Sequence, residues 1–150
     1  MEQAEQAVLL ICRTPTGLCG LPIRSVFETI RPLPLARFDG APPFVLGLAV
    51  IRGFPVPVVD VGLLVGGRQS NTARFVTVKA GDHIVALAVD HVVGIRVIPA
   101  ASLQGLPPLL KEGGAAIEAI GTLDAELLVV LKSALLVPDA VWFTLGSLKS

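Results

Sequence analysis

Short apolar runs rich in Val, Ile and Leu recur along the chain, separated by Gly, Pro and Asp. Runs of this length with turn residues between them are typical of β-strands joined by hairpins. The pattern predicts four hairpins, formed by residues 8–12 with 18–23, 44–51 with 54–59, 75–79 with 83–89, and 116–122 with 127–131. The chain is therefore expected to be all-β.

Helical periodicity is confined to short pieces, at residues 25–30, 61–65 and 132–137, with a fourth candidate at 140–148. Residues 33–43 and 100–114 are rich in Pro, Gly and Ala and are expected to be loops. The segment 138–150 is expected to be a packing helix or a tail.

The order of these pieces repeats along the chain. In each half, a hairpin is followed by the motif Leu-x-[Ile or Val]-x-x-Val, a proline-containing loop, a second hairpin and the motif x-x-x-Leu-Leu. The first of these motifs begins at Leu21 in the first half and at Leu87 in the second. Two copies in the same order predict an internal duplication, with two small similar barrels packed together. We expect one domain over 1–150, with the first barrel at about 8–65 and the second at about 73–137.

Composition restricts the function classes. Hydrophobic residues make up 53% of the chain, yet its most apolar stretch, 44–65, is interrupted by Arg52, Asp60, prolines and glycines. A membrane span is therefore not expected, because charge near its centre is costly. The apolar excess must be buried or form an interaction surface, which favours a protein that binds other proteins. The acidic N-terminus lacks the basic start of a secretory signal, so a cytoplasmic location is expected.

Charge and chemistry exclude further classes. The 12 basic and 12 acidic residues balance and form no basic cluster, which argues against nucleic-acid binding. Cys12 and Cys19 flank one predicted turn and are expected to be buried thiols in a reducing compartment. The adjacent Asp90 and His91 would point to opposite faces of a strand, and no metal-ligand spacing or phosphate loop is present. An enzyme is not expected, nor is a cofactor or metal.

Residues 44–65 contain Gly47, then Val-Ile-Arg-Gly ending at Gly53, then Pro-Val-Val-Asp ending at Asp60. This stretch resembles the central motif of the CheW family of chemotaxis coupling proteins, a Gly-Val, then Asn-Leu-Arg-Gly, then a strand ending Pro-Val-x-Asp-Leu. Segments beginning at Leu21, Ala88 and Gly121 are also similar to that family, in matching order over about residues 8–137.

The resemblance implies two intertwined five-stranded SH3-like barrels. It implies a non-catalytic adapter that binds the regulatory domain of a CheA-type histidine kinase and the cytoplasmic tip of a methyl-accepting chemoreceptor. Val50 stands where the family usually has Asn, Gly62 where it often has Arg, and Lys132 where it often has Asp. These departures leave open which kinase and receptor the chain serves.

Six residues are candidates for partner binding: Val26, Glu28, Gly47, Arg52, Val89 and Val92. Arg52 at a predicted turn is suited to bind a carboxylate bidentately, or is simply a solvated turn residue. Glu28 is the acidic candidate near the groove that the resemblance implies between the two barrels, or an exposed turn carboxylate.

The remaining candidates also have two interpretations. Val26, Val89 and Val92 line an apolar groove for a receptor helix, or belong to the core. Gly47 relieves a strand crossing or permits close backbone approach. Asp60 is expected to cap the helical turn 61–65 rather than contact a partner. An alternative function is a stand-alone SH3-like module for extended peptides, disfavoured because the chain has one Trp and no Tyr for an aromatic pocket.

Overall fold

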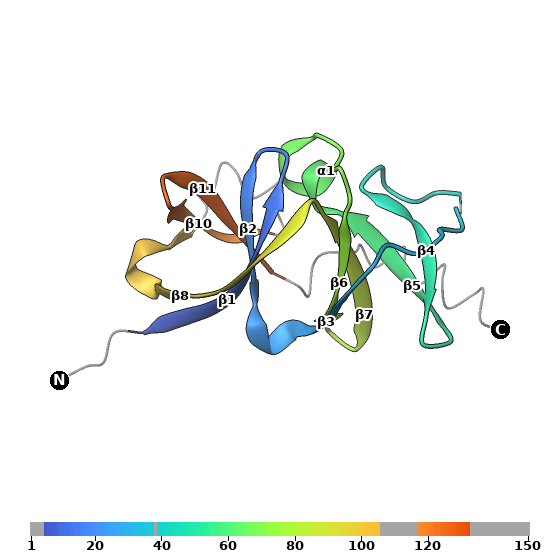
Figure 1. The fold of residues 1–150 in the computed structure, drawn as a ribbon, viewed down its shortest axis with the longest axis horizontal. Helices are drawn as coiled ribbons and strands as arrows, with labels where there is room; N and C mark the ends of the chain where they lie inside the picture. Colours follow the sequence, from blue (N-terminus) through green and yellow to red (C-terminus); the bar gives the residue numbers. More distant parts are fainter. Residues whose placement is uncertain (1–4, 38, 106–116, 133–150) are drawn as a thin grey trace.

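The computed structural model describes residues 5–37, 39–105 and 117–132, which are mostly β-strand (Figure 1). The first half of the chain contains β1 (Gln6–Thr14), β2 (Gly17–Pro22), the single-turn 3-10 helix η1 (Ile23–Ser25), β3 (Val26–Ile30), β4 (Val45–Ile51), β5 (Phe54–Asp60) and α1 (Val61–Gly66). The second half contains β6 (Arg74–Ala80), β7 (His83–Val89), β8 (His91–Pro99), η2 (Ala100–Ser102), β9 (Gln104–Gly105), β10 (Ile117–Leu123) and β11 (Glu126–Leu131).

The four predicted hairpins and the helical turn at 61–65 are confirmed. The predicted helix at 25–30 is wrong, because most of this segment forms β3 and pairs with β6. The β-branched residues Val26, Thr29 and Ile30 suit a strand better than a helix. Strand β8 was not predicted. Its alternate residues Val93, Ile95 and Val97 are apolar yet exposed, so it lacks the usual polar alternation. The helical predictions at 132–137 and 140–148 and the tail at 138–150 lie almost entirely outside the described residues.

The strands form two sheets. Sheet A has the order β8-β1-β2-β11-β10-β9, and sheet B has the order β3-β6-β7-β5-β4. Neighbouring strands are antiparallel except for β11 with β2 in sheet A and β5 with β7 in sheet B. Apart from the two-residue β9, the sheets have the same order when β1 to β5 are matched with β6, β7, β8, β10 and β11. The strand orders of the two sheets therefore show the internal repeat that the sequence predicted.

The two sheets do not divide the chain at the predicted boundary. Strands β1 and β2 belong to sheet A, whereas β3, β4 and β5 of the same half belong to sheet B. Strands β6 and β7 likewise join sheet B, and β8 to β11 join sheet A. The assignment of residues 8–65 and 73–137 to separate barrels is therefore wrong, because each sheet takes its strands from both halves. The intertwining implied by the family resemblance describes this arrangement.

Alternation along the strands creates three packed layers. One set of side chains packs in a core shared by both sheets. This set includes Leu10, Cys19, Val76 and Leu87. The opposite faces of the same strands fill two smaller clusters. Val58, Phe75 and Ala86 are in the cluster of sheet B, and Leu9, Ile11 and Leu128 are in that of sheet A. Because central strands are buried on both faces, they appear in the sequence as continuous apolar runs. This burial accounts for much of the high hydrophobic fraction.

Cys12 and Cys19 are register partners across the first hairpin, and both are buried free thiols. Cys12 and burial together raise the pKa of the Cys19 thiol. Since the thiolate is the reactive form of cysteine, this pair is suited to core packing, as the sequence predicted.

Within the described ranges, no helix is long and apolar enough to cross a membrane. The same residues include no group of three or more His, Cys, Asp and Glu side chains arranged to hold a metal ion.

Candidate partner-binding surface

Arg52 and Glu28 form a bidentate ion pair. Nε of Arg52 donates to Oε1 of Glu28 at 3.0 Å, and Nη2 donates to Oε2 at 2.9 Å. Glu28 lies on β3, one edge of sheet B, and Arg52 lies in the turn after β4, the opposite edge. The ion pair therefore joins the two edges of the sheet, which must curve round for them to meet.

The turn that presents Arg52 is a two-residue hairpin loop. Arg52 has φ 53° and Gly53 has φ 84°, so both residues of the loop are left-handed. Such turns match the twist of the flanking strands and favour glycine. An arginine held in this conformation projects from the tip of the hairpin, and its side chain is 76% exposed, against 31% for Glu28.

The pair shifts the titration of both groups. The hydrogen bonds and charge of Arg52 lower the pKa of the Glu28 carboxyl, and Glu28 raises the pKa of the guanidinium. At neutral pH the pair is therefore fully ionised. Sequence reasoning placed both residues near one groove and expected Arg52 to bind a carboxylate of a partner protein. In this structure, the carboxylate that Arg52 binds belongs to Glu28 of the same chain.

Large apolar side chains are exposed next to the ion-paired residues in sequence. Phe27, Val50 and Phe54 are 58%, 70% and 65% exposed. Exposed aromatic and aliphatic groups beside a charged pair are characteristic of protein interaction surfaces. Sequence reasoning did not select Phe27 or Phe54. The sequence signal that could have identified them is a large apolar residue directly beside a charged residue or a turn, where a polar residue is more usual.

Val26 and Val92 occupy equivalent positions in the two sheets. Val26 is the register partner of Val78 on β6, and Val92 is the register partner of Cys12 on β1. Each lies beside a β-bulge, and both are half-buried against the shared core. They are thus partly accessible at the margin of the core that joins the sheets, and their role in a receptor groove stays a prediction.

Two other candidates, Val89 and Gly47, are buried inside the fold. Val89 is fully buried in the shared core, so it is not available to a partner on the surface. Gly47 is also buried and has φ 150°, and a Cβ there would lie 2.7 Å from the carbonyl oxygen of Ala36. The backbone of Ala36 pairs with Leu48 at this point. Gly47 thus permits close approach of two chain segments, as one of its two interpretations predicted.

Asp60 caps α1, as predicted. Its Oδ1 accepts from the backbone N–H of Leu63 at 3.0 Å, and both carboxylate oxygens accept from the N–H of Ser70 at 3.1 Å. Gly62, which departs from the family pattern, packs beneath the same loop. A Cβ on Gly62 would lie 2.2 Å from the carbonyl oxygen of Arg68. A longer side chain requires a different path for this loop.

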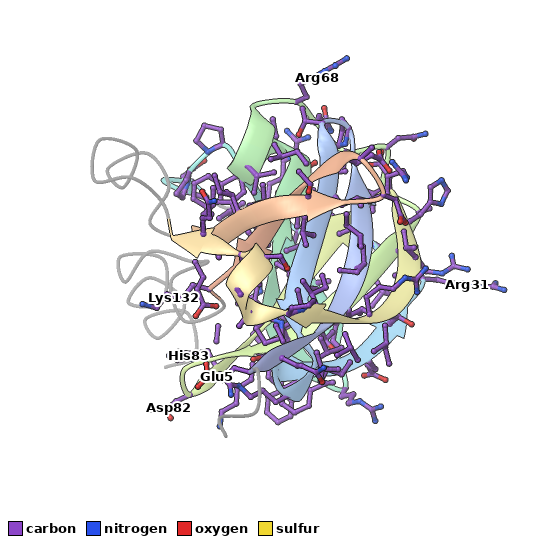
Figure 2. The ribbon with its side chains drawn as sticks, turned by 90° about the vertical axis from the view of Figure 1, so that its left-hand side faces the viewer. Glu5, Arg31, Arg68, Asp82, His83 and Lys132 are labelled. Carbon is purple, nitrogen blue, oxygen red and sulfur yellow. The ribbon has the colours of Figure 1, made fainter. Side chains whose placement is uncertain are left out.

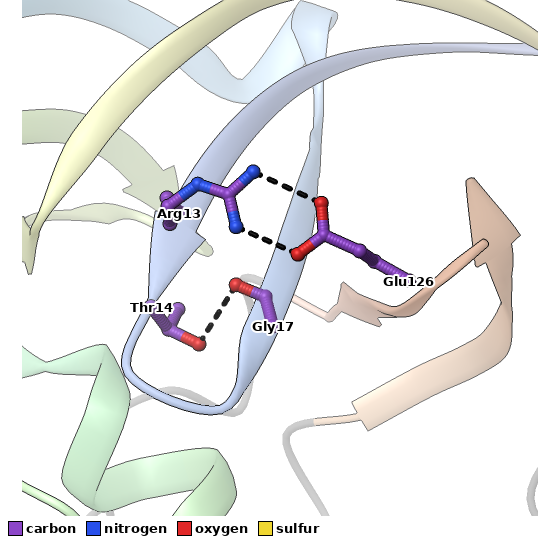
Figure 3. Close-up of polar contacts among 4 residues, drawn as sticks. All are labelled: Arg13, Thr14, Gly17 and Glu126. Atoms are coloured by element: carbon purple, nitrogen blue, oxygen red, sulfur yellow. Dashed lines mark hydrogen bonds and ion pairs between the residues drawn. The ribbon is translucent and has the colours of Figure 1, made fainter. Parts of the chain in front are cut away.

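A second bidentate ion pair links distant parts of sheet A. Arg13 at the end of β1 donates to both carboxylate oxygens of Glu126 at 2.7 Å and 2.9 Å (Figure 3). The pair holds the β10–β11 turn against the first hairpin, where Thr14 Oγ1 donates to the carbonyl of Gly17. Arg13 lowers the pKa of the Glu126 carboxyl. Sequence reasoning missed this pair because its members are 113 residues apart.

Comparison with known proteins agrees with this architecture. The model of the CheW-like domain matches residues 8–141. The chain belongs to the CheW-like domain family. It is 24% identical over 115 residues to "Chemotaxis protein CheW" from Helicobacter pylori, an alignment covering 75% of this chain and 70% of that protein.

Among solved structures, the CheW-like chain resembles the scaffolding protein TtCheW from Thermoanaerobacter tengcongensis. The TM-score is 0.73 at 23% identity, over 85% of this chain and 90% of that one. At this identity, the similarity shows the fold. The prediction of an all-β, SH3-like CheW architecture is therefore confirmed.

Proposed function

We propose that this protein is a non-catalytic adapter that couples chemoreceptors to a CheA-type histidine kinase. Membership of the CheW-like domain family supports a scaffold role in chemotaxis. The observation that carries the specific proposal is the Arg52–Glu28 ion pair with exposed Phe27, Val50 and Phe54 beside it in sequence. Exposed apolar groups next to an ordered charged pair supply both the area and the orientation that a protein partner requires.

Val26 and Val92 are the proposed receptor contacts. Both are half-buried and apolar, and both lie at the margin of the core shared by the two sheets. An amphipathic helix from a receptor tip docks in such a place by burying its apolar face. Arg52 and Glu28 act together, with the guanidinium oriented by Glu28 and its exposed part directed to a partner.

Kinase and receptor binding are tested separately by titrating the protein with a CheA-type regulatory domain and with a chemoreceptor cytoplasmic tip. Saturable binding of both, and a ternary complex on gel filtration, is the expected result. The matched control is a proline-rich peptide, the ligand of the alternative SH3-like module. Binding of that peptide with no binding of kinase or receptor would replace the adapter proposal. The cytoplasmic location stays a prediction.

A further inference from the structure

The two halves of the chain depend on each other for their sheets. We name residues 6–66, from β1 to the end of α1, the first half, and residues 74–131, from β6 to β11, the second half. Four strand pairings join one half to the other in the described structure: β1 with β8, β2 with β11, β3 with β6, and β5 with β7. The shared core also takes buried side chains from both halves. Neither half completes a sheet by itself.

One connection, residues 67–73, joins these halves, and its start is hydrogen-bonded back to the first half. The N–H of Ser70 donates to both oxygens of Asp60, and the N–H of Gly62 donates to Ser70 Oγ at 3.1 Å. The N–H of Arg68 donates to the carbonyl of Gly62. We call these contacts the Asp60–Ser70 closure. Arg68 itself projects from the periphery of the molecule (Figure 2).

The end of the connection is bonded to the second half instead. The N–H of Asn71 donates to Asp90 Oδ1 at 2.9 Å, and the N–H of Ala73 donates to the carbonyl of Val89. The connection is thus bonded to the first half up to Ser70 and to the second half from Asn71 onward. If the halves separated, residues 67–70 would have to straighten to span the gap between them, which breaks their hydrogen bonds to the first half.

From this topology, we propose that the Asp60–Ser70 closure keeps the two halves paired within one molecule, and that loosening it lets two copies exchange halves. In the exchanged dimer, the first half of one copy pairs with the second half of the other. All four joining strand pairs and the shared core are re-formed. Of the contacts described for the connection, exchange breaks the hydrogen bonds that fold it back on the first half, so these bonds set the balance between the two states.

The chemistry of the closure fits this role. Asp60 is a carboxylate with 0% exposure, and burying a charge is costly unless hydrogen bonds compensate it. Two backbone N–H groups donate to Asp60. That of Leu63 lies within α1, and that of Ser70 follows the end of α1. The bond to Leu63 serves as a helix cap and survives exchange. The bonds to Ser70 do not, which makes them specific to the closed chain.

A reporter disulfide distinguishes exchange from ordinary surface association. Val8 and Val97 are register partners from different halves and are 40% and 55% exposed. In the full chain carrying Val8→Cys and Val97→Cys, oxidation links the halves of one molecule or, after exchange, of two. Free thiols are alkylated before the sample is run on a denaturing, non-reducing gel. The reporter chain alone is expected to run as a monomer.

The closure variants are Asp60→Asn, Ser70→Ala and deletion of residues 67–69, each in the reporter chain. After refolding over a range of concentrations, Asp60→Asn is expected to raise the dimerisation constant about a hundredfold, about tenfold for each of two hinges. The deletion is expected to give a covalent dimer at all concentrations, because a shortened hinge favours exchange. Asp90→Ala is the matched control. It removes the contact with Asn71, which both states retain, so it is expected to leave the monomer fraction unchanged.

Circular dichroism confirms which variants fold. Folded closure variants that stay monomeric at every concentration would overturn the proposal. Non-covalent dimers that separate into monomers on the denaturing gel would also overturn it, because they associate without exchange. An equal rise in dimer for Asp90→Ala and Asp60→Asn would assign the effect to general destabilisation, with the same consequence. If Asp60→Asn does not fold, Ser70→Ala and the deletion give the result.

Discussion

The guanidinium of Arg52 and the carboxylate of Glu28 join the two opposite edges of sheet B, 24 residues apart in sequence, through two hydrogen bonds. The pair fixes the path of the β4–β5 turn relative to β3. It also orients the exposed part of the guanidinium, which would otherwise sample many rotamers. Arg52 and Glu28 therefore form one structural unit, which the proposed function treats as a single binding element rather than two separate contacts.

Removal of either member of this unit is expected to impair the same binding event. Glu28→Gln should weaken partner binding by a factor similar to that of Arg52→Ala, about tenfold or more, and the double variant should lose no more than the worse single variant. Arg52→Lys should restore binding only in part, because an ammonium cannot make the bidentate contact. Titration against receptor tip and kinase domain measures each affinity. Wild-type affinity of Glu28→Gln for both partners would show that Glu28 has no orienting role.

The pair also predicts a pH dependence. Because Arg52 lowers the pKa of Glu28 in the folded protein, the stabilisation is fully present above the ordinary carboxyl pKa of the unfolded chain. It is lost as the pH falls through the lowered value. NMR titration should find that Arg52→Gln raises the pKa of Glu28 toward its ordinary value. Glu126, whose pKa is lowered by Arg13, is the internal control and should not change. A Glu28 titration unaffected by Arg52→Gln would contradict the ion pair.

Val26 and Val89 are expected to separate binding from folding. Val26→Asp and Val92→Asp should leave a folded protein that no longer binds the receptor tip, since both side chains are only half-buried. Val89→Asp places a carboxylate in a fully buried site, and an uncompensated charge there costs roughly 3–5 kcal/mol. That is a large part of the stability of a small domain. Circular dichroism with a receptor pull-down tests all three. A folded Val89→Asp variant, or an unfolded Val26→Asp variant, would reverse the assignment.

Gly62 predicts a steric effect. Gly62→Ala places a Cβ 2.2 Å from the carbonyl oxygen of Arg68 and 2.8 Å from Ser70 Oγ. Overpacking of this kind typically costs about 1–3 kcal/mol, which thermal unfolding detects. Gly105→Ala is the matched control, because a Cβ there meets no atom within 4 Å. Equal melting temperatures for the two variants would mean that the loop above Gly62 moves without cost.

The sequence by itself determined the type and order of most elements. Apolar runs separated by Gly, Pro and Asp identified eight of the strands. The repeated order of these runs identified the duplication, which appears as the matching strand orders of the two sheets. Asp60 before an apolar turn was sufficient to predict the cap on α1. These features depend on neighbouring residues, so local patterns record them.

The tertiary structure alone decided how the repeats share their strands and which candidates meet. Pairing of β2 with β11 or β5 with β7 joins segments far apart in the chain, and apolar patterning does not specify which buried strand lies beside which. The same limit applies to Arg13 with Glu126, and to Val89, whose apolar character suits a groove and a core equally. Burial and long-range contact are properties of the assembled sheets, and for this reason only the folded chain separated the surface residues Arg52 and Glu28 from the structural residues Val89 and Gly47.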